Sequence, residues 1–348
     1  MNPLPWPQRL VCRLVPQLRS PLWRVIMLAN LALHLGYLLP LCLGRHFQMA
    51  DVDVYALAAE HVVTGQQLYP LFPTGDPPTP DGGFLPFLYP PPFAAALAPL
   101  GYLPHQAIVR VLYLVTFLAF WAYALCLGRL TTGRWGLWPT LGAGLILTVF
   151  PGSYFSLVSG QVEPLLWLVF ALALLTPARG ALLAVSCLVK PFAVWPLALA
   201  AWRERRRVLW QAAAVLVAGL ALGGLVAGWA SYAEWLGYAP SRMYRVAFFH
   251  DNISLSLLPL RLVGWQALPQ WGKAFLIGMY LLGPAAVAWL TRRRPLTVQY
   301  AWVGAAAILF APFSRDYYLP LLLAPLALEV GLWLQEPSSP ENSERPVA

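Results

Sequence analysis

Long runs without a single charged residue most strongly restrict what this chain of 348 residues can fold into. Each run approaches or exceeds the roughly 18 to 20 apolar residues that cross a bilayer as a helix. The strands of a membrane β-barrel would instead alternate polar and apolar residues. Hydrophobic residues make up 59% of the chain and charged residues only 11%, a balance rare in water-soluble domains. The sequence therefore predicts an all-α polytopic membrane protein. The clearest charge-free runs are 136–162, 208–229, 274–291 and 296–314.

The apolar pattern predicts about ten transmembrane helices. The first follows several arginines and superficially resembles a signal peptide, but it is long and no small-residue cleavage site follows it. We therefore interpret it as an uncleaved first span. The predicted spans are 22–43, 106–128, 135–150, 161–176, 178–189, 191–202, 208–229, 272–291, 296–312 and 317–334.

Two polar segments interrupt this pattern within what we interpret as one membrane domain, residues 1–335. A long first extracytoplasmic loop spans 45–104 and ends in an apolar stretch, 91–103, that we expect to form an interfacial helix. A second large extracytoplasmic loop is predicted at 231–271. The polar segment 336–348 is predicted to be a disordered cytoplasmic tail.

The distribution of basic residues predicts the orientation in the cell membrane. The net charge of +9 does not indicate nucleic acid, because the arginines form short clusters between apolar spans instead of one basic face. The positive-inside rule then places the N-terminus in the cytoplasm. The arginines assigned to the cytoplasm are Arg129, Arg134, Arg179, Arg203, Arg205, Arg206, Arg207, Arg292, Arg293 and Arg294.

The segment 178–202 needs a special arrangement, because Arg179 and the arginines from Arg203 onward both belong to the cytoplasmic side. One ordinary helix would separate them across the membrane. Lys190-Pro191 supplies a break in the middle, since proline removes a backbone donor and clashes with the preceding turn. We predict a hairpin of two short helices with Lys190 at its apex. A lysine there is a functional candidate, and the alternative is a snorkelling side chain.

This topology collects many polar residues on the extracytoplasmic side, where we expect any active site. Asp51 and Asp53 follow the first span, and a carboxylate near the membrane surface can act as a general base. The alternative is a solvated or helix-capping acid. The four cysteines show no metal-ligand spacing, and we predict no metal. The collected residues are Asp51, Asp53, Tyr55, Tyr89, Gln161, Glu163, Lys190, Arg242, Arg245, His250, Asp251, Asn252, Arg315, Asp316, Tyr317 and Tyr318.

An ordered set of short motifs resembles glycosyltransferase family 87, the polyprenyl-phosphate-sugar-dependent mannosyltransferases of the GT-C superfamily. Each motif is weak alone, and the resemblance runs in order from Asp51 to about Pro325. Glu163 stands where the family more often has an amide, and Arg315 also departs from the family pattern. The motifs are Asp51-Val52-Asp53-Val54-Tyr55, Ala58-Ala59, Gly65, Leu68-Tyr69, Tyr89-Pro90-Pro91, Gly160-Gln161, Lys190-Pro191, Asn252-Ile253-Ser254-Leu255 and Pro312-Phe313-Ser314-Arg315-Asp316-Tyr317-Tyr318.

The resemblance implies a GT-C-like helical bundle whose large first external loop carries a catalytic aspartate. Asp51 matches that position, and Asp53 is the second candidate. It also implies an inverting transfer of a hexose, mannose in the family, from a polyprenyl-phosphate sugar to an extracytoplasmic glycolipid or glycan. Asp51 would deprotonate the acceptor hydroxyl as the lipid phosphate leaves. That chemistry implies no cofactor, since the leaving group is already a phosphate.

The other polar residues receive binding roles under this hypothesis. A leaving phosphate requires positive charge and hydrogen-bond donors. We assign Lys190, Arg242, Arg245 and Arg315 to the donor phosphate, although Arg242 and Arg245 are also compatible with a solvated loop. We assign Tyr55, Tyr89, Gln161, Glu163, His250, Asp251, Asn252 and Asp316 to substrate binding, with helix capping as the alternative for Gln161 and Glu163.

Two other classes of protein compete with the enzyme hypothesis. A membrane transporter or flippase of lipid-linked sugars would be expected to show internal repeats and polar groups near the bilayer midplane. The sequence shows no convincing repeat, and apart from Lys190 the informative polar groups cluster in external loops. A membrane scaffold without catalysis predicts that Asp51→Asn has no effect. We therefore favour an enzyme that works at the membrane surface.

Overall fold

The computed structural model describes residues 20–44, 51–69, 87–245, 252–264 and 270–335. In these residues the regular elements are helices, and the only β pairing is an isolated antiparallel bridge between Asn252 and Arg315. The prediction of an all-α membrane protein is confirmed at this level.

Five helical segments are long and apolar enough to cross a membrane. The first is continuous from Pro21 to Gly44, with a π-helical turn in its middle. Its backbone begins at Ser20, whose hydroxyl accepts from the amide of Trp23. The five segments are α2 (Pro21–Leu33) with η1 (His34–Leu38) and α3 (Leu39–Gly44), α6 (His105–Thr132), α12 (Arg206–Ala227), α15 (Gln270–Leu290), and η5 (Asp316–Leu322) with α17 (Leu323–Gln335).

Shorter helices occupy the other predicted spans. Their positions agree with the sequence pattern, but their lengths fall below a full crossing of the hydrocarbon core. The total of about ten spans therefore stays a prediction. The shorter helices are α7 (Leu137–Val149), α9 (Glu163–Leu175), α10 (Arg179–Val189), α11 (Val194–Glu204) and α16 (Leu296–Leu309).

Both segments predicted as loops contain helices. Within 45–104 the chain forms α4 (Asp51–Thr64), whose residues Val52, Val54, Ala58 and Ala59 are buried against the rest of the protein. The predicted helix at 91–103 is present as α5 (Pro91–Leu97) and η2 (Ala98–Tyr102). Within 231–271 lie α13 (Ala230–Arg245), η4 (Leu255–Leu257) and α14 (Leu258–Leu262). The predicted tail, 336–348, lies outside the described residues.

The hairpin predicted at 178–202 is confirmed. α10 ends at Val189, Lys190 is extended, and the short turn η3 (Pro191–Ala193) leads into α11. The two ends of the hairpin meet, since Arg179 Nη1 lies 2.5 Å from Glu204 Oε1. The Tyr300 hydroxyl adds a hydrogen bond of 2.9 Å to the same carboxylate. Lys190 therefore lies at the apex, one helix length from this pair.

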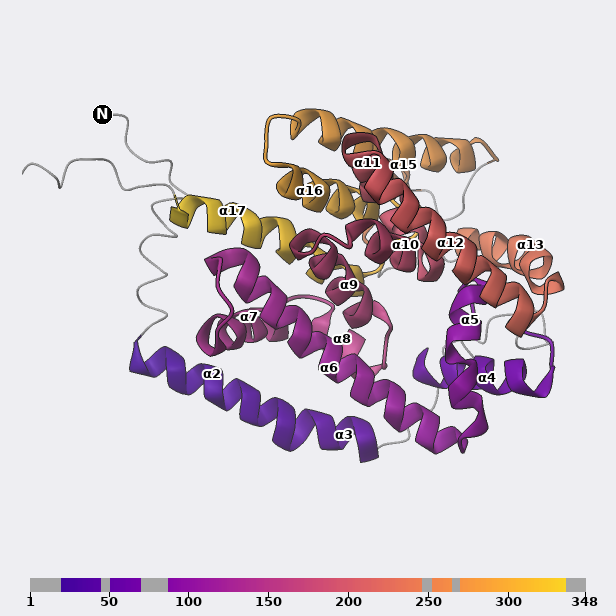
Figure 1. Cartoon of the computed structure of the whole chain (residues 1–348), viewed down its shortest axis with the longest axis horizontal. Coiled ribbons are helices and arrows are strands. Elements are labelled where there is room, and N and C mark those ends of the chain that lie inside the picture. Colours follow the sequence, from indigo (N-terminus) through magenta and orange to yellow (C-terminus); the bar gives the residue numbers. More distant parts are fainter. Residues whose placement is uncertain (1–19, 45–50, 70–86, 246–251, 265–269, 336–348) are drawn as a thin grey trace, which may run out of the picture.

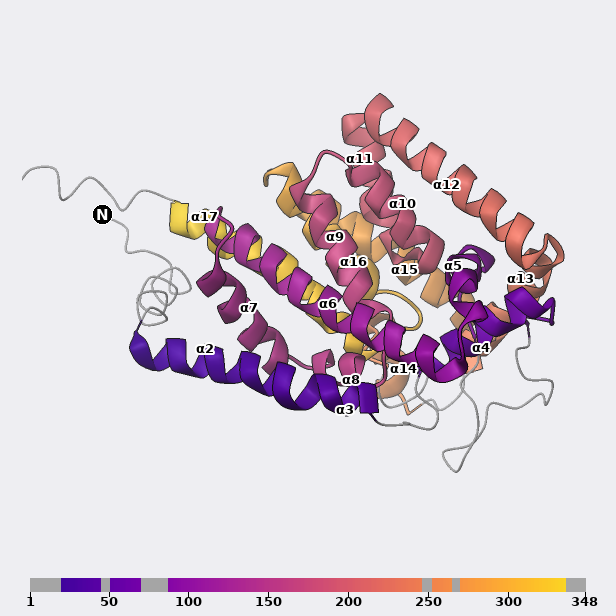
Figure 2. The same cartoon turned by 60° about the horizontal axis from the view of Figure 1, so that its bottom comes forward.

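The bundle is built around α6, which packs against α7, α9 and α17. Large side chains such as Phe120, Tyr123, Trp167 and Phe170 fill its interior. α4, α5 and α13 gather at one end, opposite the start of α2 and the end of α17 (Figures 1 and 2). Outward faces of α2, α12 and α15 expose many large apolar side chains, as expected for surfaces in contact with lipid. The site described next lies where α4 meets the bundle.

Candidate active site

A tight turn between α8 (Ser153–Val158) and α9 presents Gln161 and Glu163 to the cluster. Gly160 has φ +64°, and the amide of Gln161 bonds back to the Ser156 carbonyl at 2.9 Å. Glycine adopts this left-handed conformation without the penalty of a Cβ. The Thr116 hydroxyl of α6 donates to the Gln161 carbonyl at 3.2 Å, which fixes the backbone of Gln161.

Asp51 is the first residue of α4 and is half-buried against this turn. The next amide, that of Val52, donates to the Ser159 carbonyl at 3.2 Å, and Gln161 Nε2 donates to Asp51 Oδ2. A Cβ at Gly160 would lie only 2.7 Å from the Cβ of Val52, so glycine is needed for this approach. The positive end of the α4 dipole also favours a carboxylate here.

Two buried tyrosines extend the network from Gln161. The Tyr55 hydroxyl donates to Gln161 Oε1 at 3.1 Å and lies 2.6 Å from the Tyr89 hydroxyl. Tyr55 is one helical turn after Asp51 and therefore shares its face of α4. Trp235 of α13 donates to the Leu88 carbonyl at 3.0 Å, which holds the segment that carries Tyr89.

Lys190 lies over the ring of Tyr89. Its Nζ forms an ion pair with Glu163 Oε1 and donates to the Tyr318 hydroxyl at 2.8 Å. The ammonium group also lies 4.8 Å from the ring centroids of Tyr89 and Tyr318 and 5.5 Å from that of Tyr317. The Glu163 side chain is fully buried and that of Lys190 is 15% exposed. Glu163 thus balances the Lys190 charge in this cluster, and the contact of Lys190 with the donor phosphate stays a prediction.

Arg315 is the second cation of the cluster, and its guanidinium lies 5.2 Å from the ring centroid of Tyr317. Its backbone is held by the bridge to Asn252. The Asn252 side chain is buried, with Oδ1 accepting from the amides of Ser254 and Ser314 at 3.0 Å each. Asn252, predicted to bind substrate, thus has its side-chain oxygen engaged in ordering the segment before Arg315.

The surroundings of Asp51 change its proton affinity. Burial raises the pKa of Asp51 to about 7, and the Glu163 charge adds to the rise. Lys190, Arg315 and the hydrogen bond from Gln161 act in the opposite direction. A carboxyl with a pKa near neutrality is suited to accept a proton from a hydroxyl group. Burial likewise raises the pKa of Tyr55 and Tyr89, so both hydroxyls stay protonated.

Asp53 contacts a different part of the protein from Asp51. Its Oδ1 lies 3.3 Å from His105 Nε2 at the start of α6, and His105 Nδ1 lies 2.9 Å from Glu60 Oε1. Asp53 thus contacts α6 through His105, whereas Asp51 contacts the turn before α9. The two acids of the motif differ in surroundings, although they are only two residues apart.

The predicted site residues differ in where the structure places them. Arg242 and Arg245 lie in α13, but their side chains are outside the described residues, as are His250 and Asp251. Asp316 is half-buried at the start of η5, and its carbonyl packs closely against Gly152. Asp51, Tyr55, Tyr89, Gln161, Glu163, Lys190 and Arg315 form one cluster through hydrogen bonds, ring contacts and charge interactions.

Two participants were not assigned to the site from the sequence. Tyr318 bonds the Lys190 ammonium group, and His105 clamps α4 to α6. Tyr318 ends the family-like motif 312–318 and is among the polar residues collected on the predicted extracytoplasmic side, but the sequence alone gives it no partner. His105 follows Pro104 at the start of an apolar run, and that position gives no sign of its acidic partners.

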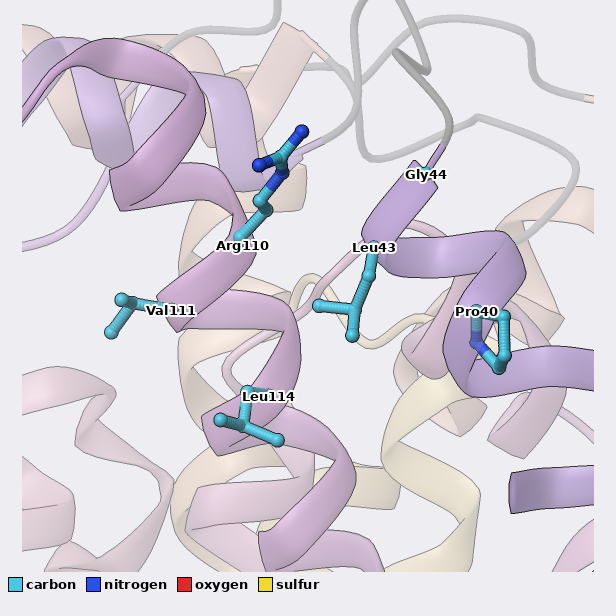
Figure 3. Close-up of a pocket in the computed structure, with 6 residues that line it drawn as sticks. All are labelled: Pro40, Leu43, Gly44, Arg110, Val111 and Leu114. Atoms are coloured by element: carbon cyan, nitrogen blue, oxygen red, sulfur yellow. The ribbon is translucent and has the colours of Figure 1, made fainter. Parts of the chain in front are cut away.

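An apolar groove of about 480 Å³ lies between α3 and α6 (Figure 3). Leu43, which lines the groove, also packs against the small core of Cys42, Val52 and Tyr113, and Val52 follows Asp51 in the chain. Arg110 and Gly44 lie at one end of the groove and Leu114 at the other. The lining residues are Pro40, Leu43, Gly44, Arg110, Val111 and Leu114. Among the described residues no group of three or more acidic, histidine or cysteine side chains is arranged to hold a metal ion.

Apolar helices around a cluster of acid, amide, phenol and cationic groups define a membrane protein with a candidate acid–base site. The family model described as glycosyltransferase family 87 matches residues 87–328. The chain belongs to this family and is a membrane glycosyltransferase. The match includes Gln161, Glu163, Lys190 and Arg315 and begins after Asp51. No curated protein and no solved structure matches the chain.

Proposed function

We propose that this glycosyltransferase transfers a hexose, in particular mannose, from a polyprenyl-phosphate sugar to an extracytoplasmic glycolipid or glycan, with inversion. The observation that carries the proposal is the position of Asp51, half-buried at the start of α4 with its pKa raised to about 7. The cations Lys190 and Arg315 lie close enough to influence that carboxyl.

The reaction needs one base and one site for a leaving phosphate. Asp51 removes the proton from the acceptor hydroxyl, and the acceptor oxygen forms a bond to the anomeric carbon. The bond from that carbon to the phosphate oxygen breaks, and the lipid phosphate leaves with the electron pair. Lys190 and Arg315 are the candidate phosphate contacts, because both are cations whose charges act on Asp51.

A polyprenyl donor also needs apolar surface beside the reacting centre. The groove between α3 and α6 offers it, one layer of side chains from Val52, and Arg110 adds positive charge at one end. We place the donor's lipid chain in this groove. Leu114→Trp is then expected to raise KM for the lipid donor more than for the acceptor.

The test uses purified protein in lipid with a panel of labelled polyprenyl-phosphate sugars, a labelled nucleotide sugar, and membrane-extracted acceptors. Transfer from a polyprenyl-phosphate hexose, with mannose preferred, supports the proposal. Transfer from the nucleotide sugar alone contradicts the assigned donor. Movement of the labelled lipid across vesicles without transfer would instead favour a flippase.

A further inference from the structure

The Gln161 side chain is held in one orientation from both of its ends. Nε2 donates to Asp51 Oδ2, while Oε1 accepts from the Tyr55 hydroxyl at 3.1 Å. A carboxamide has a donor end and an acceptor end, so turning it over would bring its carbonyl oxygen against the Asp51 carboxylate. Gln161 is 1% exposed, so water offers little alternative bonding.

The orientation of the Gln161 amide is determined by a chain of hydrogen bonds that starts at Tyr89 and passes through Tyr55. The Tyr55 hydroxyl has one proton, which it donates to Gln161 Oε1. At the distance of 2.6 Å the Tyr55 oxygen must then accept from the Tyr89 hydroxyl. Both tyrosines are at least nine-tenths buried. The chain runs from Tyr89 through Tyr55 and Gln161 to Asp51.

We propose that Tyr55 and Tyr89 are positioning residues, which hold the Gln161 amide with its N–H toward Asp51 and so keep that carboxylate ionised and aimed at the acceptor. The inference rests on the proposed role of Asp51 as the base. It deepens that role, because it assigns the control of the base to two phenols that need not touch the transferred sugar.

Other groups also act on Asp51 and must be separated from this effect. Removal of a tyrosine hydroxyl leaves these groups in the protein and breaks the hydrogen-bond chain; for Tyr55 it also removes a hydrogen bond with the Val162 backbone. The titratable and charged groups that face Asp51 or titrate with it are Glu163 of α9, Lys190 of the hairpin apex, Arg315 and Tyr317 around the start of η5, Tyr113 of α6, and Tyr55 and Tyr89 themselves.

Tyr55→Phe leaves Gln161 Oε1 without its donor and lets the amide turn away from Asp51. The carboxylate then loses a stabilising hydrogen bond and binds a proton more readily. The acidic limb of the pH profile of kcat/KM is expected to move to higher pH by roughly 0.5 to 1 unit, with the rate recovering at alkaline pH. Tyr89→Phe should give a smaller shift in the same direction.

The matched control is Tyr113→Phe, because the Tyr113 hydroxyl lies near Asp51 but donates to the Val158 carbonyl at 2.9 Å. The acidic limb of the pH profile of kcat/KM for Tyr113→Phe should stay at its wild-type pH. Gln161→Met should shift the limb as Tyr55→Phe does, and the two changes together should shift it no further, since they break the same chain.

The outcomes separate this inference from the proposed function. If Asp51→Asn abolishes transfer while Tyr55→Phe and Tyr89→Phe keep the wild-type limb, the positioning role is wrong and the base stands. An equal shift from Tyr113→Phe would also overturn the positioning role. If Asp51→Asn transfers normally, the proposed function itself is wrong. A tyrosine variant that does not fold is replaced in this comparison by the other tyrosine variant.

Discussion

The carboxyl of Asp51 accepts a hydrogen bond from the buried amide of Gln161, and burial raises its pKa to about 7. A pKa near the working pH suits a general base. A raised pKa means that Asp51 is protonated, and so inactive as a base, below that value. Transfer should therefore fall as pH decreases through about 7 and level off above it. The measurement is kcat/KM against pH, and an acidic limb near the ordinary aspartate value would contradict this environment.

The Glu163–Lys190 pair provides a second prediction at the scale of single residues. Lys190→Met leaves Glu163 as a buried unpaired charge and should cost about 3 to 5 kcal/mol of stability. Adding Glu163→Gln removes that charge and should restore most of the loss. Thermal unfolding in detergent of the two single variants and the double variant tests this. A Lys190→Met protein as stable as wild type would exclude the internal ion pair.

At this scale the sequence located the polar cluster but not its internal pairing. Lys190 is identifiable because charged residues are rare within apolar spans, whereas Asp51 and Gln161 are singled out by the resemblance to glycosyltransferase family 87. Which cation faces which acid depends on side-chain packing across elements distant in the chain. The ion pair of Lys190 with Glu163 is such a pairing, while the phosphate contact of Lys190 stays a prediction.

At the scale of elements, the helical hairpin is the arrangement that brings Lys190 to the cluster. A continuous helix would separate positions 179 and 204 by about 38 Å along its axis. The hairpin instead brings Arg179 and Glu204 into an ion pair of 2.5 Å. Cysteines at these two positions should therefore be joined efficiently by a short bifunctional reagent, in a background without the four native cysteines. Absence of cross-linking in folded protein would contradict the hairpin.

Helix positions followed closely from the apolar pattern, while α4 and α13 did not. Both carry many polar residues and lie in segments interpreted as loops. α4 is stabilised by tertiary packing against η2, α5 and α6, which buries Val52, Val54, Tyr55 and three alanines. Such packing is not visible in the local pattern, because propensity and periodicity describe only neighbours along the chain.

At the scale of the whole molecule, we propose that the cluster lies on the extracytoplasmic side. A membrane-impermeant maleimide applied to intact cells should label Tyr102→Cys, since Tyr102 is 82% exposed beside α5. Arg293→Cys, in the exposed turn between α15 and α16, should react only after permeabilisation. Both substitutions again require replacement of the native cysteines. The reverse pattern of labelling would invert the assigned orientation.

The central claim is that Asp51, and not its neighbour Asp53, is the base for glycosyl transfer. The most direct test compares transfer from a labelled polyprenyl-phosphate sugar by wild type, Asp51→Asn and Asp53→Asn, after thermal unfolding has shown that all three are folded. Asp53→Asn is the matched control, because Asp53 contacts His105 at the start of α6. The account predicts a loss of about 10² to 10⁴-fold for Asp51→Asn and a retained rate for Asp53→Asn. Equal transfer by wild type and Asp51→Asn would contradict it.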